Sequence, residues 1–341
     1  MGLRVLEPGL YSLLVGRGRV GTRHLGVPVG GPADVAACAM GNALVGNEAD
    51  ALALEASLRG PSLVAEQPVA AVVFGAPFQL SSSTGQALEV GRTFNLAVGE
   101  TLKIGGTPMG CRAYLCVAGG FDGKEILGSE SALEPVRKGE VLACRSSAMR
   151  VRSPVATSFQ LVATGRANEN SRSDTPPTIL ATSWKLVATG KQTRFRDADD
   201  TLVLRVLPGL QRDWFDVSPF FTQTYTVSEA SNRMGLRLKG TPLLRPPQEL
   251  ASEPVAPGGV QITNDGLPVI LGVDGQTIGG YPKIAHVIRA DLDSLGQLRP
   301  GDRVGFVEVS FADAENAYAE ARPALRKMLA RWRAGASPEF G

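Results

Sequence analysis

The chain has 341 residues, 43% of them hydrophobic and 20% charged, which suits ordinary folded cores and excludes an intrinsically disordered protein. Its 35 basic and 33 acidic residues leave a net charge of +2, so charge gives no reason to expect a nucleic-acid or membrane-surface partner. At about 100–200 residues per domain, this length predicts two domains.

Short apolar runs separated by Gly, Pro and Asp/Asn turns dominate the chain, which is typical of a β-sandwich or β-barrel. One segment near the start is different, because Ala33–Leu44 places its apolar residues on one helical face, with Asp34 positioned to cap the free amides. The clearest strand candidates, in chain order, are Val69–Phe74, Thr93–Ala97, Arg112–Ala118, Leu202–Leu207 and Val269–Gly272.

The middle of the chain changes character. Residues 166–177 are polar, lack large aliphatic side chains and end in two prolines, which predicts a loop or linker. A ten-residue repeat brackets it, ATSFQLVATG at 156–165 and ATSWKLVATG at 181–190, and indicates a local duplication or a pair of similar hairpin strands. We therefore expect an insertion near 145–200 within a first domain of residues 1–197, and a second domain of residues 198–311.

The last segment, 312–341, is expected to contain a C-terminal helix and a tail. Ala312–Ala334 is rich in Ala, Glu, Arg and Leu, which are strong helix formers. Pro323 falls inside it and predicts a break or a restart of the helix, because proline has no amide hydrogen to donate.

Cysteines and histidines give no sign of a metal or disulfide framework. No cysteine forms a C-x-x-C pair, and the only histidines, His24 and His286, are far apart, so we expect reduced cysteines in apolar surroundings and no zinc site. The four cysteines are Cys38, Cys111, Cys116 and Cys144. The first 21 residues do not resemble a signal peptide, and no uncharged apolar run reaches about 18 residues. Together these observations predict a cytoplasmic protein.

The richest candidate for chemistry is the segment DGQTIGGYPKIAHVI at 274–288. Gly279 and Gly280 allow a ligand to approach the backbone, Tyr281 offers a ring and a hydroxyl, and Lys283 offers a cation. Neutral hydrogen-bonding groups come from the neighbouring side chains of Gln276 and Thr277. A carboxylate, carboxamide or phosphate would find partners here, although a Gly-Gly hairpin with an exposed lysine would give the same pattern.

Three further positions suggest a ligand site. The glycine-rich loop 19–32 carries Arg23 and His24, which could hold an anion and move a proton, unless His24 is only a structural residue. Glu55 lies among apolar residues, so it must be paired with an arginine or have a raised pKa. In SNRMGL, Asn232 could bind an amide and Arg233 an anion, unless the segment is simply a turn into a strand.

Common catalytic signatures are missing from the sequence. It contains no G-x-x-x-x-G-K-[ST] loop for ATP phosphates and no G-x-S-x-G elbow of a serine hydrolase. The stretch GRGRVG at 16–21 matches G-x-G-x-x-G, but it does not open a helix and is not taken as a dinucleotide site.

Taken in order, these segments resemble the biotin-dependent carboxyltransferase A/B family (allophanate hydrolase subunit 2/KipA), and within it the group of 5-oxoprolinase C subunits. The resemblance runs from about Val5 to Val309. The stretches that carry it are Gly21–Gly31, Asn42–Asn47, Ala53–Glu55, Arg112–Asp122, Leu127–Ser131, Arg205–Gly209, Asn232–Leu238, Gly258–Leu271, Gln276–Ile288 and Arg299–Val304.

The resemblance implies a mainly β fold of two cyclophilin-like β-barrels with a few short helices. It also implies an enzyme subunit that works with a KipI-like partner (the 5-oxoprolinase B subunit) and a LamB-like subunit, in ATP-dependent opening of 5-oxoproline to L-glutamate. ATP would be used by the assembled complex. No A-M-K-M biotin-attachment motif occurs, so no covalent biotin is expected on this chain.

Two alternatives stay open: a non-catalytic KipA-like protein that binds a KipI-like partner, and the carboxyltransferase component of a urea carboxylase-like biotin enzyme. The chain departs from the family pattern at several polar positions, which favours the first of these. The departures are at Val15-Gly16, Gly75-Ala76-Pro77, Glu130, Asn232 and Gly275.

We expect the site in a groove where the Gly279–Lys283 turn of the second domain faces Arg23, His24 and Glu55 of the first, because small-molecule pockets often form between domains. The resemblance and the chemistry together suggest three catalytic residues, His24, Tyr281 and Lys283. The expected substrate-binding residues are Arg23, Asp34, Glu55, Asn232, Arg233, Gln276, Thr277, Gly279 and Gly280.

Overall fold

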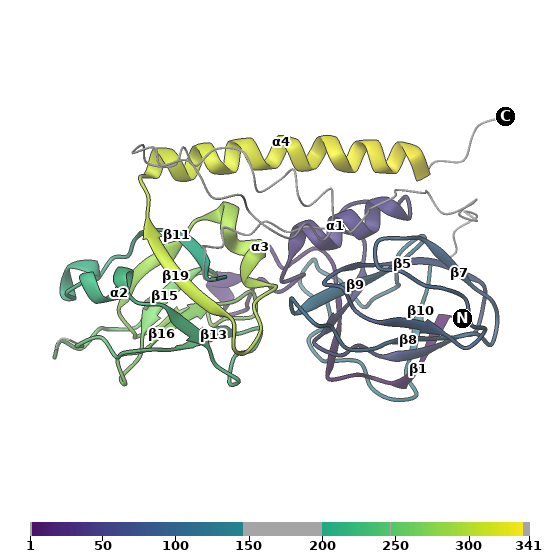
Figure 1. Cartoon of the computed structure of the whole chain (residues 1–341), viewed down its shortest axis with the longest axis horizontal. Helices are drawn as coiled ribbons and strands as arrows, with labels where there is room; N and C mark the ends of the chain where they lie inside the picture. The colour runs from purple at the N-terminus through teal and green to yellow at the C-terminus, as the bar shows by residue number, and fades with distance from the viewer. Residues whose placement is uncertain (1, 146–199, 246, 337–341) are drawn as a thin grey trace, which may run out of the picture.

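The computed structural model describes residues 2–145, 200–245 and 247–336. The predicted loop at 166–177, the ten-residue repeats and the expected boundary near residue 198 lie outside this part of the chain. Figure 1 shows two β-rich halves side by side with one long helix lying along both. The mainly β fold class predicted from the sequence is confirmed.

The first half consists of two five-stranded antiparallel sheets. One has the order β10-β1-β4-β8-β6, with β1 (Gly2–Glu7), β4 (Ser62–Ala65), β6 (Leu80–Ser82), β8 (Thr101–Ile104) and β10 (Val141–Ala143). The other has the order β2-β3-β9-β5-β7, with β2 (Tyr11–Val15), β3 (Ala53–Ser57), β5 (Val69–Gly75), β7 (Phe94–Leu96) and β9 (Arg112–Val117).

Strand β5 explains how the second of these sheets is buried on both faces. Ala71 and Val73 belong to the core that the two sheets share, whereas Val72 between them packs with Cys38 of helix α1 (Val35–Leu44). This is the two-residue alternation of a strand. The helix begins as predicted, because the Asp34 carboxylate accepts a hydrogen bond from the amide of Ala37 at 2.9 Å.

The second half is a closed seven-stranded barrel of order β11-β18-β15-β16-β13-β12-β19. The one parallel pair in the barrel joins β11 to β19, and the other neighbours are antiparallel. The barrel strands are β11 (Leu202–Pro208), β12 (Tyr225–Val227), β13 (Gly235–Lys239), β15 (Gly259–Ile262), β16 (Pro268–Leu271), β18 (Lys283–Val287) and β19 (Arg303–Glu308). A small ladder, β14 (Glu253–Pro254) with β17 (Ile278–Gly279), lies beside it.

Short helical segments join the strands. They are the turns η1 (Arg23–Leu25), η3 (Arg212–Trp214) and η4 (Arg289–Asp291), and the helices α2 (Ser218–Thr222) and α3 (Leu292–Leu295). The four cysteines are free, three of them buried and Cys144 half-buried, so the prediction of small apolar cysteines is confirmed.

Helix α4 (Phe311–Ala336) crosses both halves and packs on α1 (Figure 1). Its ring contact near the C-terminal end joins Trp332 to Phe74 of β5, edge to face, with ring centroids 5.9 Å apart. The predicted break at Pro323 is wrong, because the helix continues through this residue. Pro323 lies on the exposed side, where the lost amide hydrogen bond faces water rather than the core.

Candidate functional site

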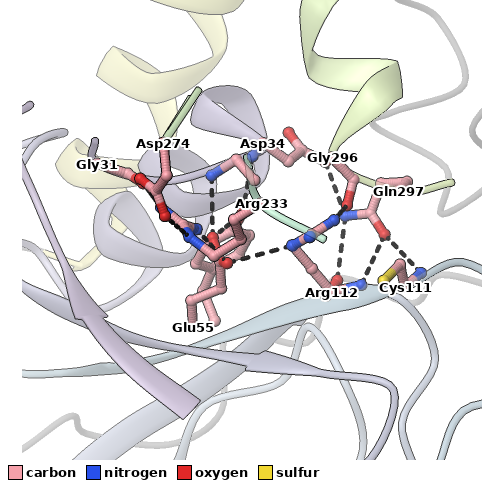
Figure 2. A network of polar contacts seen from close by, with 11 residues as sticks. Gly31, Asp34, Glu55, Cys111, Arg112, Arg233, Asp274, Gly296 and Gln297 are labelled. Carbon is pink, nitrogen blue, oxygen red and sulfur yellow. Dashed lines mark hydrogen bonds and ion pairs between the residues drawn. The ribbon is translucent and has the colours of Figure 1, made fainter. Parts of the chain in front are cut away.

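A buried carboxylate, Glu55 of β3, lies where the two halves meet, and its side chain is fully shielded from solvent. It accepts hydrogen bonds from the Ala33 amide at 2.9 Å, the Tyr114 hydroxyl at 3.0 Å and the Arg112 Nε at 3.2 Å. Arg233 of the second half adds a fourth donor (Figure 2). The ion pair with arginine was one of the two states that the sequence allowed for Glu55.

Arg233 reaches across the junction from the turn before β13. Its Nε lies 2.6 Å from Asp274, and its Nη2 donates to the carbonyl oxygen of Gly31 at 2.7 Å. Figure 2 shows its guanidinium between Glu55 and Asp274. The two ion pairs occupy the donors that we expected to bind an anionic ligand, so Arg233 holds the two halves together instead.

A second set of contacts continues the junction on the other side of Glu55. Arg112 donates from Nη1 to the carbonyl of Gly296, and the Gln297 side chain accepts from the amides of Cys111 and Arg112 at 3.2 and 3.1 Å. The Gln297 amide nitrogen donates to Asp34 at 2.8 Å. Asp34, predicted to bind substrate, therefore caps α1 and contacts the second half.

The protonation of Glu55 follows from these contacts. Burial alone would raise the pKa of the carboxyl, but the charges of Arg233 and Arg112 and the Ala33 amide outweigh it and lower the pKa. Glu55 is therefore ionised at neutral pH and works as a fixed anion. It cannot serve as a proton donor in this arrangement.

Two adjoining hollows open on the surface of the second half, with volumes of about 440 and about 680 Å³. Asn264, Gln276 and Tyr281 line both of them, so the hollows share one wall. The first extends towards Asn232 and Arg237, and the second towards Arg245. Small-molecule sites are commonly concave and carry a few convergent polar groups.

The shared wall contains several of the residues predicted from the sequence. Gln276 and Tyr281 are exposed to the hollows, and Gly279 and Gly280 line the second of them. Asn232 uses its Oδ1 to accept from the Met234 amide at 2.8 Å, which leaves its amide nitrogen for another partner. Gly279 packs tightly, because a Cβ there would lie 2.6 Å from the Gln276 amide nitrogen and 2.8 Å from that of Gln261.

Lys283 is placed differently from the expectation of an exposed or ligand-bound cation. Its side chain is only 9% exposed and forms an ion pair with Glu253 of β14. Gln211 binds both residues, through the Lys283 amide at 3.0 Å and the Glu253 carboxylate at 2.9 Å. In the described part of the chain no hydrogen bond or ion pair joins Lys283 to His24 or Glu55.

The predicted groove is only partly present. Loop 19–32 does meet the second half, through the Gly30 amide to the Val273 carbonyl at 3.0 Å, but it meets the start of segment 274–288 rather than the Gly279–Lys283 turn. His24 is exposed in η1 and lines neither hollow. Arg23 keeps both terminal nitrogens shielded from solvent, and burial lowers its pKa. Thr277 is buried and its carbonyl accepts from Val255 at 3.0 Å.

Sequence reasoning missed Arg237 and Arg245, which bring positive charge to the hollows. The signal for Arg237 is its place on β13, where Leu236 and Leu238 point into the core and Arg237 points out. Arg245 lies in an irregular proline-rich stretch, and only the fold brings it beside Tyr281.

Two classes of site are not found among residues 2–145, 200–245 and 247–336. No group of three or more His, Cys, Asp and Glu side chains there is arranged to hold a metal ion. None of the helices in these ranges combines the length and apolar character that a membrane span requires.

Comparison with known proteins gives relatives over nearly the whole chain. It is 31% identical to the 5-oxoprolinase C subunit of Escherichia coli over 92% of this chain and 93% of that protein. It is also 31% identical to the 5-oxoprolinase C subunit of Haemophilus influenzae, over 87% and 88% of the two chains. The urea amidolyase of Lachancea kluyveri is 30% identical over 90% of this chain, which covers only 17% of that larger protein.

Solved structures agree with the fold. The urea carboxylase of Kluyveromyces lactis matches with a TM-score of 0.76 and 26% identity, over 99% of this chain and 30% of that one. Another solved relative is 32% identical with a TM-score of 0.71, and this chain spans about half of it, 56% of its length. The family model for the carboxyltransferase domain, subdomains A and B, matches residues 25–308. The chain therefore belongs to the family of carboxyltransferase domains with subdomains A and B.

Proposed function

We propose that this chain is a subunit of an ATP-dependent amidohydrolase of the 5-oxoprolinase type and that it supplies one wall of a shared active site. The observation that carries the proposal is the match to two 5-oxoprolinase C subunits at 31% identity, along 93% and 88% of their lengths. Its partners would be a KipI-like subunit and a LamB-like subunit.

The double hollow suits a small cyclic amide that bears a carboxylate. Amide side chains from Asn232, Asn264 and Gln276 can pair with the lactam N–H and carbonyl, and an arginine at one end of the hollows can attract the carboxylate. The hollows are open to solvent and wider than such a ligand, so a partner subunit is needed to close the site and exclude water.

ATP would supply the driving force, because a lactam is a stable amide. Transfer of the γ-phosphoryl group to the lactam carbonyl oxygen releases ADP and gives an imidate phosphate. Water then adds at that carbon and the ring C–N bond breaks, which gives γ-glutamyl phosphate. A second water cleaves this acyl phosphate to glutamate and inorganic phosphate. The chain has no G-x-x-x-x-G-K-[ST] loop, so we assign ATP binding to the partners.

The test is reconstitution with the partner subunits of the same organism, followed by measurement of glutamate release from 5-oxoproline. We expect ATP-dependent turnover by the complex and none by this chain alone. Gln276→Ala should lower turnover in the complex, whereas Gln86→Ala, at an exposed position of the first half, should not. Turnover by the isolated chain would refute a shared site.

A second candidate is carboxyl transfer from carboxybiotin, which the similarity to the urea amidolyase and urea carboxylase favours. A separate biotin carrier would then be required. Incubating the complex with a carboxylated biotin carrier and urea distinguishes the two activities, because only the carboxyltransferase consumes carboxybiotin. Stable binding to the KipI-like partner with neither activity would instead support the non-catalytic alternative.

A further inference from the structure

Arg245 lines the far end of the second hollow and brings a positive charge to it. Its guanidinium donates from Nη1 to the side-chain oxygen of Asn264, while its Nε is shielded from solvent and has no hydrogen-bond partner among the described residues. A ligand in the hollow can therefore reach Arg245 through the terminal end of its guanidinium and not through Nε.

The position of Arg245 is set from both sides. Asn264 lies in the turn between β15 and β16, and it lines both hollows together with Tyr281. Downstream of Arg245, β14 pairs with β17 through Glu253 opposite Gly279. Gly280 then packs against the same segment, because a Cβ there would lie 3.4 Å from the Leu250 carbonyl oxygen. These contacts hold the segment that follows Arg245 beside the wall formed by Gly279, Gly280 and Tyr281.

Arg245 also differs from neighbouring cations of the second half in how its charge is balanced. Arg233 is neutralised by the two carboxylates at the junction, and Lys283 by a glutamate of β14. Arg237 is exposed and its charge acts on an aspartate in the first hollow. Glu249 lines the end of the second hollow with Arg245, but no ion pair joins Arg245 to a carboxylate in the described part of the chain.

We propose that Arg245, held by Asn264, binds the carboxylate of the substrate. A guanidinium presents N–H donors that match a carboxylate, and the Nη2 of Arg245, unlike its Nε, is not shielded from solvent. The carboxylate would lie at the Arg245 end, with the amide of the same molecule turned towards Gln276 and Tyr281 on the shared wall. This inference rests on the proposed function for the identity of the ligand, whereas the site for a small oxyanion follows from the geometry alone.

The experiment measures binding to the full chain by isothermal titration or by ligand-observed NMR. The probes are L-5-oxoproline, its uncharged carboxamide, and inorganic phosphate as a second oxyanion. Arg245→Gln removes the charge and keeps a hydrogen-bonding side chain of moderate length. Arg237→Gln is the matched control, because it removes the same charge from the same pair of hollows.

We expect Arg245→Gln to weaken 5-oxoproline binding about ten- to a hundredfold, while Arg237→Gln changes it less than about threefold. Binding of the carboxamide should be unaffected by Arg245→Gln, because it has no carboxylate. Phosphate bound more tightly than 5-oxoproline, or equal losses in the two variants, would overturn the assignment of a carboxylate site. Absence of any oxyanion binding by the chain would do the same.

The outcome separates this inference from the proposed function. If 5-oxoproline binds in an Arg245-dependent manner but the complex never converts it to glutamate, the carboxylate site stands and the proposed reaction falls. If the complex is active and the KM for 5-oxoproline does not change in Arg245→Gln, the reaction stands and the carboxylate site falls.

Discussion

Glu55 and Arg233 form a buried ion pair between residues 178 positions apart, one from each half of the molecule. The carboxylate is 0% exposed and the arginine side chain 6% exposed, so water solvates neither charge to a large extent. Arg112, 7% exposed, contacts the same carboxylate. Two cations and two anions, Asp274 being the second, therefore balance one another at the junction.

Replacing Glu55 with Gln should strongly destabilise the protein. The amide keeps the volume of the carboxylate but leaves two buried guanidinium groups without their common counter-charge, a change that typically costs about 3–5 kcal/mol. Urea denaturation would measure the free energy of unfolding. The control is Glu89→Gln, which breaks an exposed pair with Arg92 and should cost less than about 1 kcal/mol. Equal losses in the two variants would show that the junction pair contributes no more than a surface pair.

Lys283→Met should act first on stability, not on ligand binding. The substitution leaves the Glu253 carboxylate with Gln211 as its remaining partner, at a cost of about 1–2 kcal/mol. The double variant Lys283→Met/Glu253→Gln should recover part of that loss, because it removes the unpaired charge. Thermal unfolding of the natural protein, the two single variants and the double variant gives the coupling energy. A large fall in 5-oxoproline affinity without any fall in stability would instead support the sequence-based prediction that Lys283 contacts the ligand.

Stability should depend on pH through Asp293, which follows the first residue of α3. Burial and the charge of Asp34 raise the pKa of its carboxyl to about 7, although it accepts a hydrogen bond from the Val35 amide at 2.9 Å. An unfolded aspartate has a pKa of about 3.9. Between these values the folded protein binds more protons than the unfolded chain, so the free energy of unfolding falls as pH rises from about 4 to about 7.

Asp293→Asn should remove this dependence, because the amide oxygen can still accept from Val35 and carries no charge. The difference in the free energy of unfolding between the variant and the natural protein should grow by about 1–3 kcal/mol as the pH rises from about 5 to about 8. This is less than the full pKa shift implies, because Asp293 is only half-buried. Urea denaturation at both pH values checks it. Asp213→Asn, with its side chain 95% exposed, should show no comparable change.

Pro323→Ala should stabilise helix α4. Proline in a helix interior is about 3 kcal/mol less favourable than alanine in model helices, and Pro323 is exposed, so alanine creates no clash. We expect a gain of about 1–3 kcal/mol, measured by thermal unfolding followed at the helix signal in circular dichroism. Ala324→Gly, next to it and also exposed, should have the opposite sign and cost about 1 kcal/mol. No gain in the proline variant would indicate that α4 is kinked there in solution.

The sequence predicts the local features of this molecule well. The start of α1 at Asp34 and the strands β5, β9 and β11 depend on neighbours along the chain, so periodicity and capping preferences reveal them. The break predicted at Pro323 does not occur, because the packing of the rest of the helix on α1 stabilises the helix despite an exposed proline, and this tertiary effect is not visible in the sequence.

The candidate site is harder to predict, because the ion-pair partner of each charged residue comes from a distant part of the chain. The sequence indicates that Glu55 needs an arginine but cannot choose Arg112 and Arg233, which are 57 and 178 residues away. Lys283 looks free until the fold brings Glu253 to it. Arg245 looks like part of an ordinary loop until Asn264 and Tyr281 are placed beside it.

The distance between Glu55 and Arg233 also has a consequence for how the protein is made. The ribosome adds about 5–20 residues per second, so Arg233 emerges roughly 10–35 s after Glu55. During that interval Glu55 can be held by Arg112 and Tyr114, but the surface that receives Arg233 is still open. A nascent chain stalled before Arg233 would therefore be cleaved more readily by proteases than the same residues in the finished protein, because synthesis of the second half supplies the residue that covers this surface of the first half.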